Sequence, residues 1–324
     1  MIKIKKGLDL PISGTPLPVI TDTPTVNSVS LLSNDFIGMK PTMLVKTGDL
    51  VKVGTKIFED KKNPGVFFTS PAGGTISSIN RGDKRKFLSV EIDISADEEY
   101  INFNYENNES SLRNLLIKSG LWNAFRTRPF NRTPSIDAIP DAVFINCCDT
   151  NPLSVDPYEI INSDHKNFEL ALDALKILFK SPLHLCYQNA NFNTANDGIN
   201  YHQFTGPHPA GLSSTHISSI YPVNLNRTAW TISYQDILSF GHLLNTNMLR
   251  THKTIAIGGP SVLEPSMINA RIGGNLDQLT AGKINDESRV ISGSIIFGHK
   301  SEGVMSYLGF YDSQISVIPD TAKI

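Results

Sequence analysis

The chain has 324 residues, of which 40% are hydrophobic and 19% charged, and its formal net charge is −2. It contains no apolar run near the ~18 residues that cross a bilayer and no signal-peptide-like stretch at its start, so we expect a soluble, cytoplasmic protein. Its three cysteines (Cys147, Cys148 and Cys186) are too badly spaced for a disulfide framework or a CxxC metal site, and the near-neutral charge gives no reason to expect nucleic acid.

Residues 1–103 form the first predicted domain, in which short strands alternate with turns. Proline and glycine recur along it, and strand-like pieces lie between them at Met43–Lys46, Lys56–Phe58 and Val66–Thr69. No helical period competes with this pattern. It predicts a small all-β barrel or sandwich, and the acidic stretch 95–110 marks its end.

The segment from Met43 to Ile79 has the G-D-x-V-x-x-G rhythm of biotinyl and lipoyl barrels. In those barrels a lysine at a hairpin tip carries the prosthetic group, and Lys61 lies near the corresponding place. Its turn, Lys61–Gly65, is polar and contains a proline, which does not suit a carrier lysine. We therefore predict a barrel of this type that is used without its cofactor.

Charge is spread unevenly over the next stretch of chain. Residues 37–90 carry ten Lys/Arg against four Asp/Glu, residues 91–112 carry seven acids and no base, and residues 113–132 carry five bases and no acid. One interpretation is a set of solvated faces with a flexible acidic connector. The other is a partner or anion surface built from the two basic blocks.

Residues 104–253 form the second predicted domain, in which strands and helices alternate. The predicted helices are an apolar face from Leu112 to Phe125 broken at Gly120, then Phe168–Phe179 and Gln235–Leu244; the predicted strands are Ala142–Cys148, His184–Tyr187 and Trp230–Tyr234. This alternation predicts a parallel α/β sheet with ligands at the carboxyl ends of its strands.

Residues 254–324 form the third predicted domain, which is small and rich in β-structure. Strands are predicted at Thr254–Ile257, at Val290–Ile291 and Ile295–Phe297 on either side of a Ser-Gly-Ser turn, and at Ile315–Ile318.

The segment Ser119–Pro134 holds the main candidate site residues, which are Trp122, Phe125, Arg126, Arg128 and Phe130. Arginines suit bidentate binding of carboxylate or phosphate, and aromatic rings suit stacking on a flat ligand. The alternative is that the aromatic side chains are core and that the arginines neutralise acids. The sequence leaves both open.

Two further places are candidates. His208 and His216 lie in a proline-containing loop, and because no third ligand is near them in the sequence we expect no metal site there. Asp149 and Asn151 follow a predicted strand, where they would hold either a ligand hydroxyl or their own Asx turn. Motifs of self-contained nucleotide-binding, hydrolase or metalloprotease sites are missing.

The sequence resembles the A subunits of the Na⁺-translocating NADH:quinone oxidoreductases over nearly its whole length. The motifs that carry the resemblance are GLDLPISG at 7–14, FEDKKNPGVFFTSPAGG at 58–74, INRGDKR at 79–85, SGLWNAFRTRPF at 119–130, DTNPL at 149–153, GPHPAGL at 206–212, TISYQD at 231–236 and ISGS at 291–294. Family chains continue into a C-terminal helical part, which we expect to be missing here.

The resemblance implies a multidomain α/β fold, α+β overall. Its parts would be an N-terminal barrel-sandwich hybrid, a Rossmann-like domain similar to the NADH- and flavin-binding subunit of complex I, and a C-terminal ubiquitin-like SLBB domain. It also implies a peripheral subunit on the cytoplasmic face of the bacterial inner membrane. Its partners would be the other five subunits of the complex, and it would contact the membrane only through them.

The resemblance also implies an absence of bound cofactors. The related subunits have a glycine-rich loop that lets the backbone approach nucleotide phosphates, whereas here Gly120–Arg126 carries large side chains. We expect no cofactor and no Na⁺ on this chain: NADH and flavins would belong to the whole complex, and ubiquinone stays open as a ligand. The alternatives are an independent flavin- or NAD-binding oxidoreductase and a purely structural adaptor.

Overall fold

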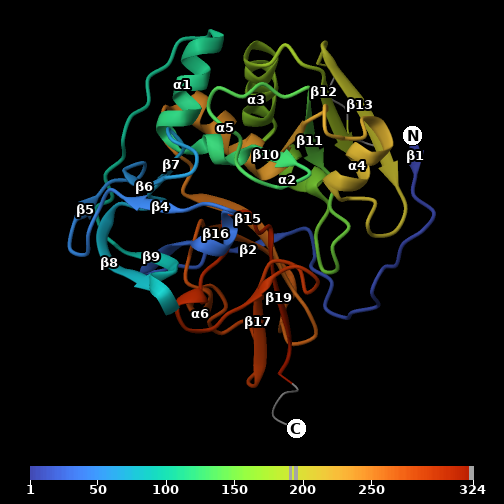
Figure 1. The fold of residues 1–324 in the computed structure, drawn as a ribbon. Coiled ribbons are helices and arrows are strands. Elements are labelled where there is room, and N and C mark those ends of the chain that lie inside the picture. The colour runs from blue at the N-terminus through green and yellow to red at the C-terminus, as the bar shows by residue number, and fades with distance from the viewer. Residues whose placement is uncertain (190–191, 193–195, 321–324) are drawn as a thin grey trace.

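Four β-sheets organise the chain in the computed structural model, which describes residues 1–189, 192 and 196–320 (Figure 1). Two of them form the barrel on the left of Figure 1, one forms an α/β layer with its helices at the top, and one lies below. Mixed α/β and β-rich parts are thus present as predicted.

The barrel is built from a four-stranded and a three-stranded sheet. In sheet order, its strands are β3 (Ser28–Leu32), β9 (Phe87–Ile94), β8 (Gly74–Arg81) and β5 (Leu50–Val51), and then β4 (Pro41–Met43), β6 (Lys56–Asp60) and β7 (Phe67–Thr69). The single-turn 3₁₀ helix η1 (Ser33–Asp35) follows β3. The buried rings of Phe36, Phe58 and Phe68 pack together in the barrel core: Phe58 stacks on Phe68, and Phe36 meets both of them edge-on.

The second sheet is the predicted parallel one. Its order is β1 (Ile2–Lys3), β13 (Ile199–Thr205), β12 (Leu183–Tyr187), β11 (Ala142–Cys147), β14 (Ala229–Ser233) and β10 (Arg126–Arg128), and only β10 is antiparallel to its neighbour. The chain moves outward from β11 to β13 on one side and returns to β14 on the other. The carboxyl ends of β11 and β14 therefore flank the switch point at which such sheets bind ligands.

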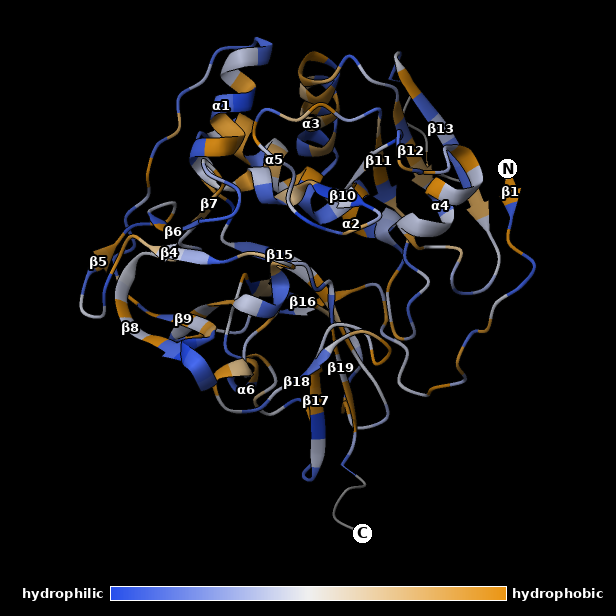
Figure 2. Cartoon of the chain, in the orientation of Figure 1, coloured by the Kyte–Doolittle hydropathy of each residue, from blue (hydrophilic) through white to orange (hydrophobic). Residues whose placement is uncertain are grey.

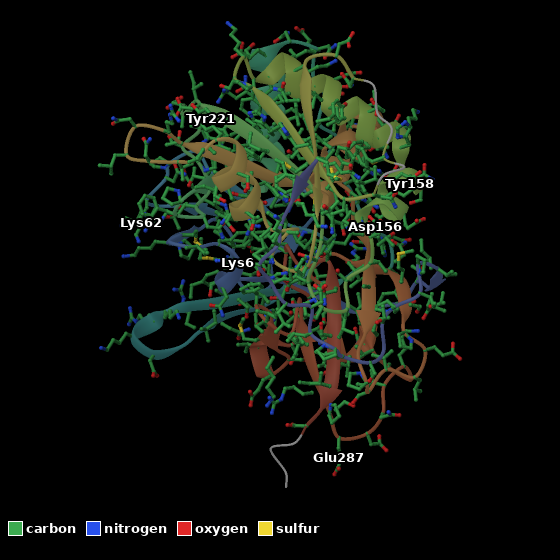
Figure 3. All side chains as sticks on the ribbon, turned by 90° about the vertical axis from the view of Figure 1, so that its right-hand side faces the viewer. Lys6, Lys62, Asp156, Tyr158, Tyr221 and Glu287 are labelled. Atoms are coloured by element: carbon green, nitrogen blue, oxygen red, sulfur yellow. The ribbon has the colours of Figure 1, made fainter. Side chains whose placement is uncertain are left out.

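Helices cover this sheet. They are α1 (Glu109–Ser119), α2 (Pro157–Ser163), α3 (His165–Leu178), α4 (Ser213–Ile220) and α5 (Tyr234–Thr246). Asp156 caps α2 by accepting the backbone N–H of Tyr158 at 3.0 Å (Figure 3). Helix α1 ends at Gly120, whose φ of 80° is the left-handed conformation that glycine tolerates best. The predicted helical break at this glycine is confirmed.

Most of the fourth sheet lies in the third predicted domain, and the N-terminal strand β2 (Ile20–Asp22) completes it. Its order is β18 (His299–Lys300), β17 (Ser288–Ser292), β19 (Gln314–Pro319), β15 (His252–Gly258), β16 (Ser266–Arg271) and β2, with the short helix α6 (Leu276–Leu279) beside it. The predicted strand at Ile295–Phe297 is wrong. Those residues form a turn in which Gly298 N–H donates to Ser294 O, and Phe297 is 67% exposed.

The first 22 residues form an arm that belongs to neither barrel sheet. Strand β1 pairs with β13 of the α/β sheet, and β2 pairs with β16 of the C-terminal sheet. Between them, Leu8 N–H donates to His208 O and Leu17 N–H donates to Pro265 O. The N-terminus thus joins two parts that lie far from it in the sequence.

Candidate functional site

The switch point between β11 and β14 is covered by the C-terminal sheet. The loop after β11 folds on itself, because Asn151 N–H donates to Asp149 Oδ1 at 2.8 Å, and the predicted Asx turn is confirmed. The other oxygen, Asp149 Oδ2, accepts from Ser313 Oγ at 3.3 Å, and Gln314 Nε2 donates to Pro152 O at 2.9 Å. Burial raises the pKa of Asp149. Ser313, just before β19, and Gln314, its first residue, therefore donate hydrogen bonds to oxygens of Asp149 and Pro152 that a ligand at the switch point could otherwise bind.

The segment after α1 is filled with side chains. The short 3₁₀ helix η3 (Leu121–Ala124) is buried throughout. Asn123 Nδ2 donates to Phe67 O at 2.8 Å and to Gly120 O at 3.0 Å, which fixes the segment against the barrel. A Cβ placed on Gly120 would lie 2.6 Å from Thr69 Oγ1. The backbone at Gly120 therefore lies directly against the barrel, with no open loop between them for a ligand.

Trp122 and Phe125 lie in the core. Both side chains are 0% exposed, and their rings pack against each other, with centroids 5.5 Å apart, and against Trp230. The indole Nε1 of Trp122 donates to Pro134 O at 3.0 Å, so its polar atom is satisfied internally. These two rings present no surface to a ligand in this structure.

Arg126 and Arg128 lie on the edge strand β10, with Phe130 in the turn beyond it. The guanidinium carbon of Arg126 is 4.1 Å from the ring centroid of Tyr311, whose hydroxyl donates to Asn123 O at 2.7 Å. Arg128 has a buried Nε without a hydrogen-bond partner among the described residues. Burial, with a smaller effect of the Arg126 charge, lowers the pKa of Arg128 to about 10. Phe130 is 72% exposed.

A group of charged side chains lies where the three parts of the chain meet, with Lys253 buried and Asp35 partly buried, and sequence reasoning missed it. Lys253 Nζ donates to Phe310 O at 2.9 Å, and Asp35 Oδ2 accepts from Phe310 N–H at 2.9 Å. Burial and the nearby Asp312 raise the pKa of Asp35 to about 7. No sequence motif marks these residues, because each is an isolated charge beside a predicted strand or turn.

An internal cavity of about 60 Å³ lies at the same junction. Its lining comes from the barrel (Phe36, Phe68), the α/β part (Gly120, Asn123, Gln235, Asp236) and the C-terminal sheet (Lys253, Phe310). Pockets that hold drug-sized ligands measure roughly 300–1,000 Å³. The residues present therefore do not fit a flavin or a dinucleotide.

His208 lies in the loop between β13 and α4, against the loop that follows β11, and His216 lies in α4. His208 Nδ1 is 3.1 Å from Thr150 Oγ1, and its backbone N–H donates to Asp9 Oδ1 at 2.9 Å. His216 is buried, bonds Ala210 O through Nε2 at 2.8 Å, and burial lowers its pKa to about 4. Within the described part of the chain, no group of three or more His, Cys, Asp or Glu side chains is placed to hold a metal ion.

The comparisons with known proteins agree with one another. Family models described as the NqrA N-terminal barrel-sandwich hybrid domain, the NqrA second alpha/beta domain and the NQRA C-terminal domain match residues 2–95, 107–249 and 254–303. A relative from Glaesserella parasuis, named as the A subunit of Na(+)-translocating NADH-quinone reductase, is 45% identical over an alignment of 331 positions that covers 99% of this chain and 74% of the relative. A Neisseria gonorrhoeae relative of the same name is 46% identical with the same coverage.

Among solved structures, a crystal structure of an NAD⁺-reducing [NiFe]-hydrogenase in the air-oxidized state is similar with a TM-score of 0.40 and 11% sequence identity. The match covers 55% of this chain and 40% of that chain. A likeness of this size supports no statement about function.

Proposed function

Because the chain belongs to the NqrA family, the A subunits of Na⁺-translocating NADH-quinone reductases, we propose that it serves as the NqrA component of such a translocase. In that role it supports electron transfer from NADH to ubiquinone coupled to Na⁺ export. It does so by assembly with the other five subunits at the cytoplasmic face of the inner membrane, and it contacts the membrane only through them.

We propose that the chain itself carries no flavin and binds no NADH. The observation that supports this is the lack of space where the three parts of the chain meet. The cavity beside Gly120 and Asn123 measures about 60 Å³, and Ser313 and Gln314 cover the switch point between β11 and β14. The alternative, an independent flavin- or NAD-binding oxidoreductase, needs a pocket several times larger there. Among the described residues, no helix is long and apolar enough to cross a bilayer.

The surface formed by Arg126, Arg128 and Phe130 is our candidate for contact with a neighbouring component of the complex. Arg128 supports this assignment, since it is half-buried and its Nε has no hydrogen-bond partner among the described residues; such a group is costly, and a carboxylate from a partner would stabilise it. The same surface is our candidate for contact with the quinone. Trp122 and Phe125 then only support this surface from the core. His208 and His216 stay separate candidates for contact with a partner or with the quinone.

The division of the chain also stays a proposal. We propose domains at residues 1–103, 104–253 and 254–324. The two strands of the N-terminal arm, β1 and β2, pair with the second and the third of these domains.

Reconstitution tests the proposal. A reductase complex depleted of NqrA is mixed with the purified chain, and we expect restored NADH-dependent quinone reduction. The Arg128→Met variant keeps the apolar stem and should restore it at least tenfold less well at equal concentration. Arg227→Met is the matched control, because Arg227 also lies over an aromatic ring, that of Tyr221, but outside this surface. Equal activity of Arg128→Met and wild type would remove this surface from the assignment.

A second measurement addresses the alternative function. Visible flavin absorption of the purified chain, or NADH oxidation by the chain alone, would favour an independent oxidoreductase. Quinone binding is best followed by calorimetric titration with a short-chain ubiquinone. Tryptophan emission is unsuitable, because Trp122 and Trp230 are both buried and make no direct contact with a ligand on the surface.

A further inference from the structure

A strongly basic groove lies on the barrel and is distinct from the cavity at the junction of the three parts, with which it shares the ring of Phe36. It measures about 480 Å³ and runs between residues 33–41 and the end of the β8–β9 hairpin. Its cationic lining residues are Lys40, Arg81, Lys84, Arg85 and Lys86. Figure 2 shows the end of this hairpin as one of the most hydrophilic parts of the ribbon.

The five cations have no salt bridge within the described residues. The hairpin turn itself carries one acid, Asp83. Asp60 is buried, and its Oδ1 already accepts the backbone N–H groups of Lys40 and Lys62, both at 3.0 Å. Like charges that share a concave surface repel one another, and the low-dielectric walls concentrate their field on whatever enters. The groove is therefore electrostatically prepared for an anionic occupant.

The hairpin end that presents these charges is conformationally unusual. Lys84 and Arg85 are consecutive non-glycine residues with φ of 52° and 60°. This left-handed region is uncommon for side chains with a Cβ, and such conformations are held at a cost. The turn thus keeps a charged pair where glycine or asparagine would be easier to accommodate.

The groove also has an apolar component. Phe36 and Phe87 line it and are buried, whereas Ile37, which also lines it, is 50% exposed. A bilayer presents a nearly planar array of phosphates, which does not enter a concave groove. A protein segment does, and one with acidic and apolar side chains would match both parts of the lining.

The acidic stretch of this chain is not that segment. Glu98 is paired with Arg271 and Glu99 with Lys52. The groove does adjoin the candidate partner surface: Arg132 ends the turn that carries Phe130, and its Nε lies 3.0 Å from the position of a Cβ on Gly38, which lines the groove.

We propose that this groove binds an acidic segment, containing at least one apolar side chain, of another protein of the same complex. The inference rests on the proposed function and extends the partner contact beyond the surface formed by Arg126, Arg128 and Phe130. It assigns five of the ten Lys/Arg of the basic block at residues 37–90 to a binding surface.

The test uses a triple variant, Lys40→Gln, Arg81→Gln and Lys86→Gln, which leaves the two positive-φ positions unchanged. The matched control, Lys3→Gln, Lys5→Gln and Lys6→Gln, removes three exposed cations from the N-terminal arm (Lys6 is labelled in Figure 3). Binding to the detergent-solubilised complex depleted of NqrA is measured at low and high salt. We expect the triple variant to bind at least tenfold more weakly at low salt than wild type and control, and the difference to shrink at high salt.

Further readouts separate the possible outcomes. A photo-crosslinker at Ile37 should yield a crosslinked peptide rich in Asp and Glu. Equal binding of the triple variant would overturn the groove assignment while leaving the proposed function intact, whereas no binding of wild type would overturn both. Loss of binding to phosphatidylglycerol vesicles, with unchanged binding to the solubilised complex, would identify a lipid occupant and overturn the proposal. Equal melting temperatures establish that the variants are folded.

Discussion

The guanidinium of Arg271 holds the carboxylate of Glu98 through both terminal nitrogens, with Nη1 2.7 Å from Oε2. The two side chains are only 7% and 15% exposed. Glu98 also accepts the backbone N–H of Gly73 at 2.8 Å, and Arg271 donates to Pro71 O at 3.1 Å. This ion pair fastens strand β16 of the C-terminal sheet to the segment that leaves the barrel.

Removing one partner of this pair should destabilise the protein strongly. Arg271→Met leaves a buried carboxylate unpaired, and we expect the free energy of unfolding to fall by ~3–5 kcal/mol. Lys52→Met is the control, because it breaks the pair with the adjacent Glu99, whose side chain is 70% exposed, and should cost at most ~1 kcal/mol. Urea unfolding measures both. Similar losses in the two variants would contradict a structural role for the buried pair.

Asp35 should make stability fall as the pH rises. Burial raises the pKa of this carboxyl to about 7 from the ordinary 3.8. Between these values the unfolded chain has lost the proton that the folded chain keeps, so folding becomes less favourable with increasing pH and the loss is complete above about 7. Asp35→Asn retains an oxygen that can accept from Phe310 N–H. It should flatten this part of the profile, as measured by unfolding at several pH values; an unchanged slope would exclude Asp35 as its source.

His216 should act in the opposite direction. Burial lowers its pKa from 6.5 to about 4, so the ring is neutral in the folded protein. Its stabilising contribution is present above 6.5 and is lost as the pH falls through about 4, since the unfolded chain takes up the proton first. Burial also lowers the pKa of His184 to about 4, so proton NMR should show two histidine rings that titrate near 4, and only the His216 signals should be absent in His216→Gln. A midpoint near the ordinary value would mean that the ring is solvated.

Arg126 should contribute to stability through the ring of Tyr311. We expect a coupling of ~0.5–2 kcal/mol between them in a double-mutant cycle built from Arg126→Met and Tyr311→Leu. The cycle with Tyr311→Phe is the control, because that variant keeps the ring and loses only the hydroxyl that donates to Asn123 O. In the Tyr311→Phe variant, Arg126→Met should still lower the free energy of unfolding by a similar amount. Its disappearance there would assign the coupling to the hydroxyl.

The regular elements of the α/β part were predictable because their apolar residues follow a local period. The spacing from Phe168 to Phe179 predicts a helix, and α3 spans His165–Leu178. Strand β13 escaped prediction, since its sequence INYHQFT is mostly polar and its pattern is set by the neighbours on either side. The apolar run Ile295–Phe297 is the reverse case, in which hydrophobic residues form an exposed turn.

The candidate site was less predictable than the fold. Trp122 and Phe125 have side chains that suit a ligand stack and a core equally well, and only the position of Trp230 decides between them. Arg126 reaches Tyr311, which lies 185 residues further along the chain. A local pattern carries no information about such a contact. The fold class and the family, by contrast, are confirmed by the matches over residues 2–95, 107–249 and 254–303.

Strands β1 and β2 pair with strands that are synthesised much later, β13 and β16, and this fixes when each pairing can form. Ile2 is synthesised about 200 residues before its partner Phe204, and Ile20 about 250 residues before its partner Met267. At the usual ~5–20 residues per second the arm stays unpaired for roughly 10–40 s. Its exposed start, including Leu8 and Leu17, is a hydrophobic segment available to chaperones throughout that interval. At one edge, the α/β sheet is therefore completed by β1 and the C-terminal sheet by β2, two strands that are synthesised long before their partners.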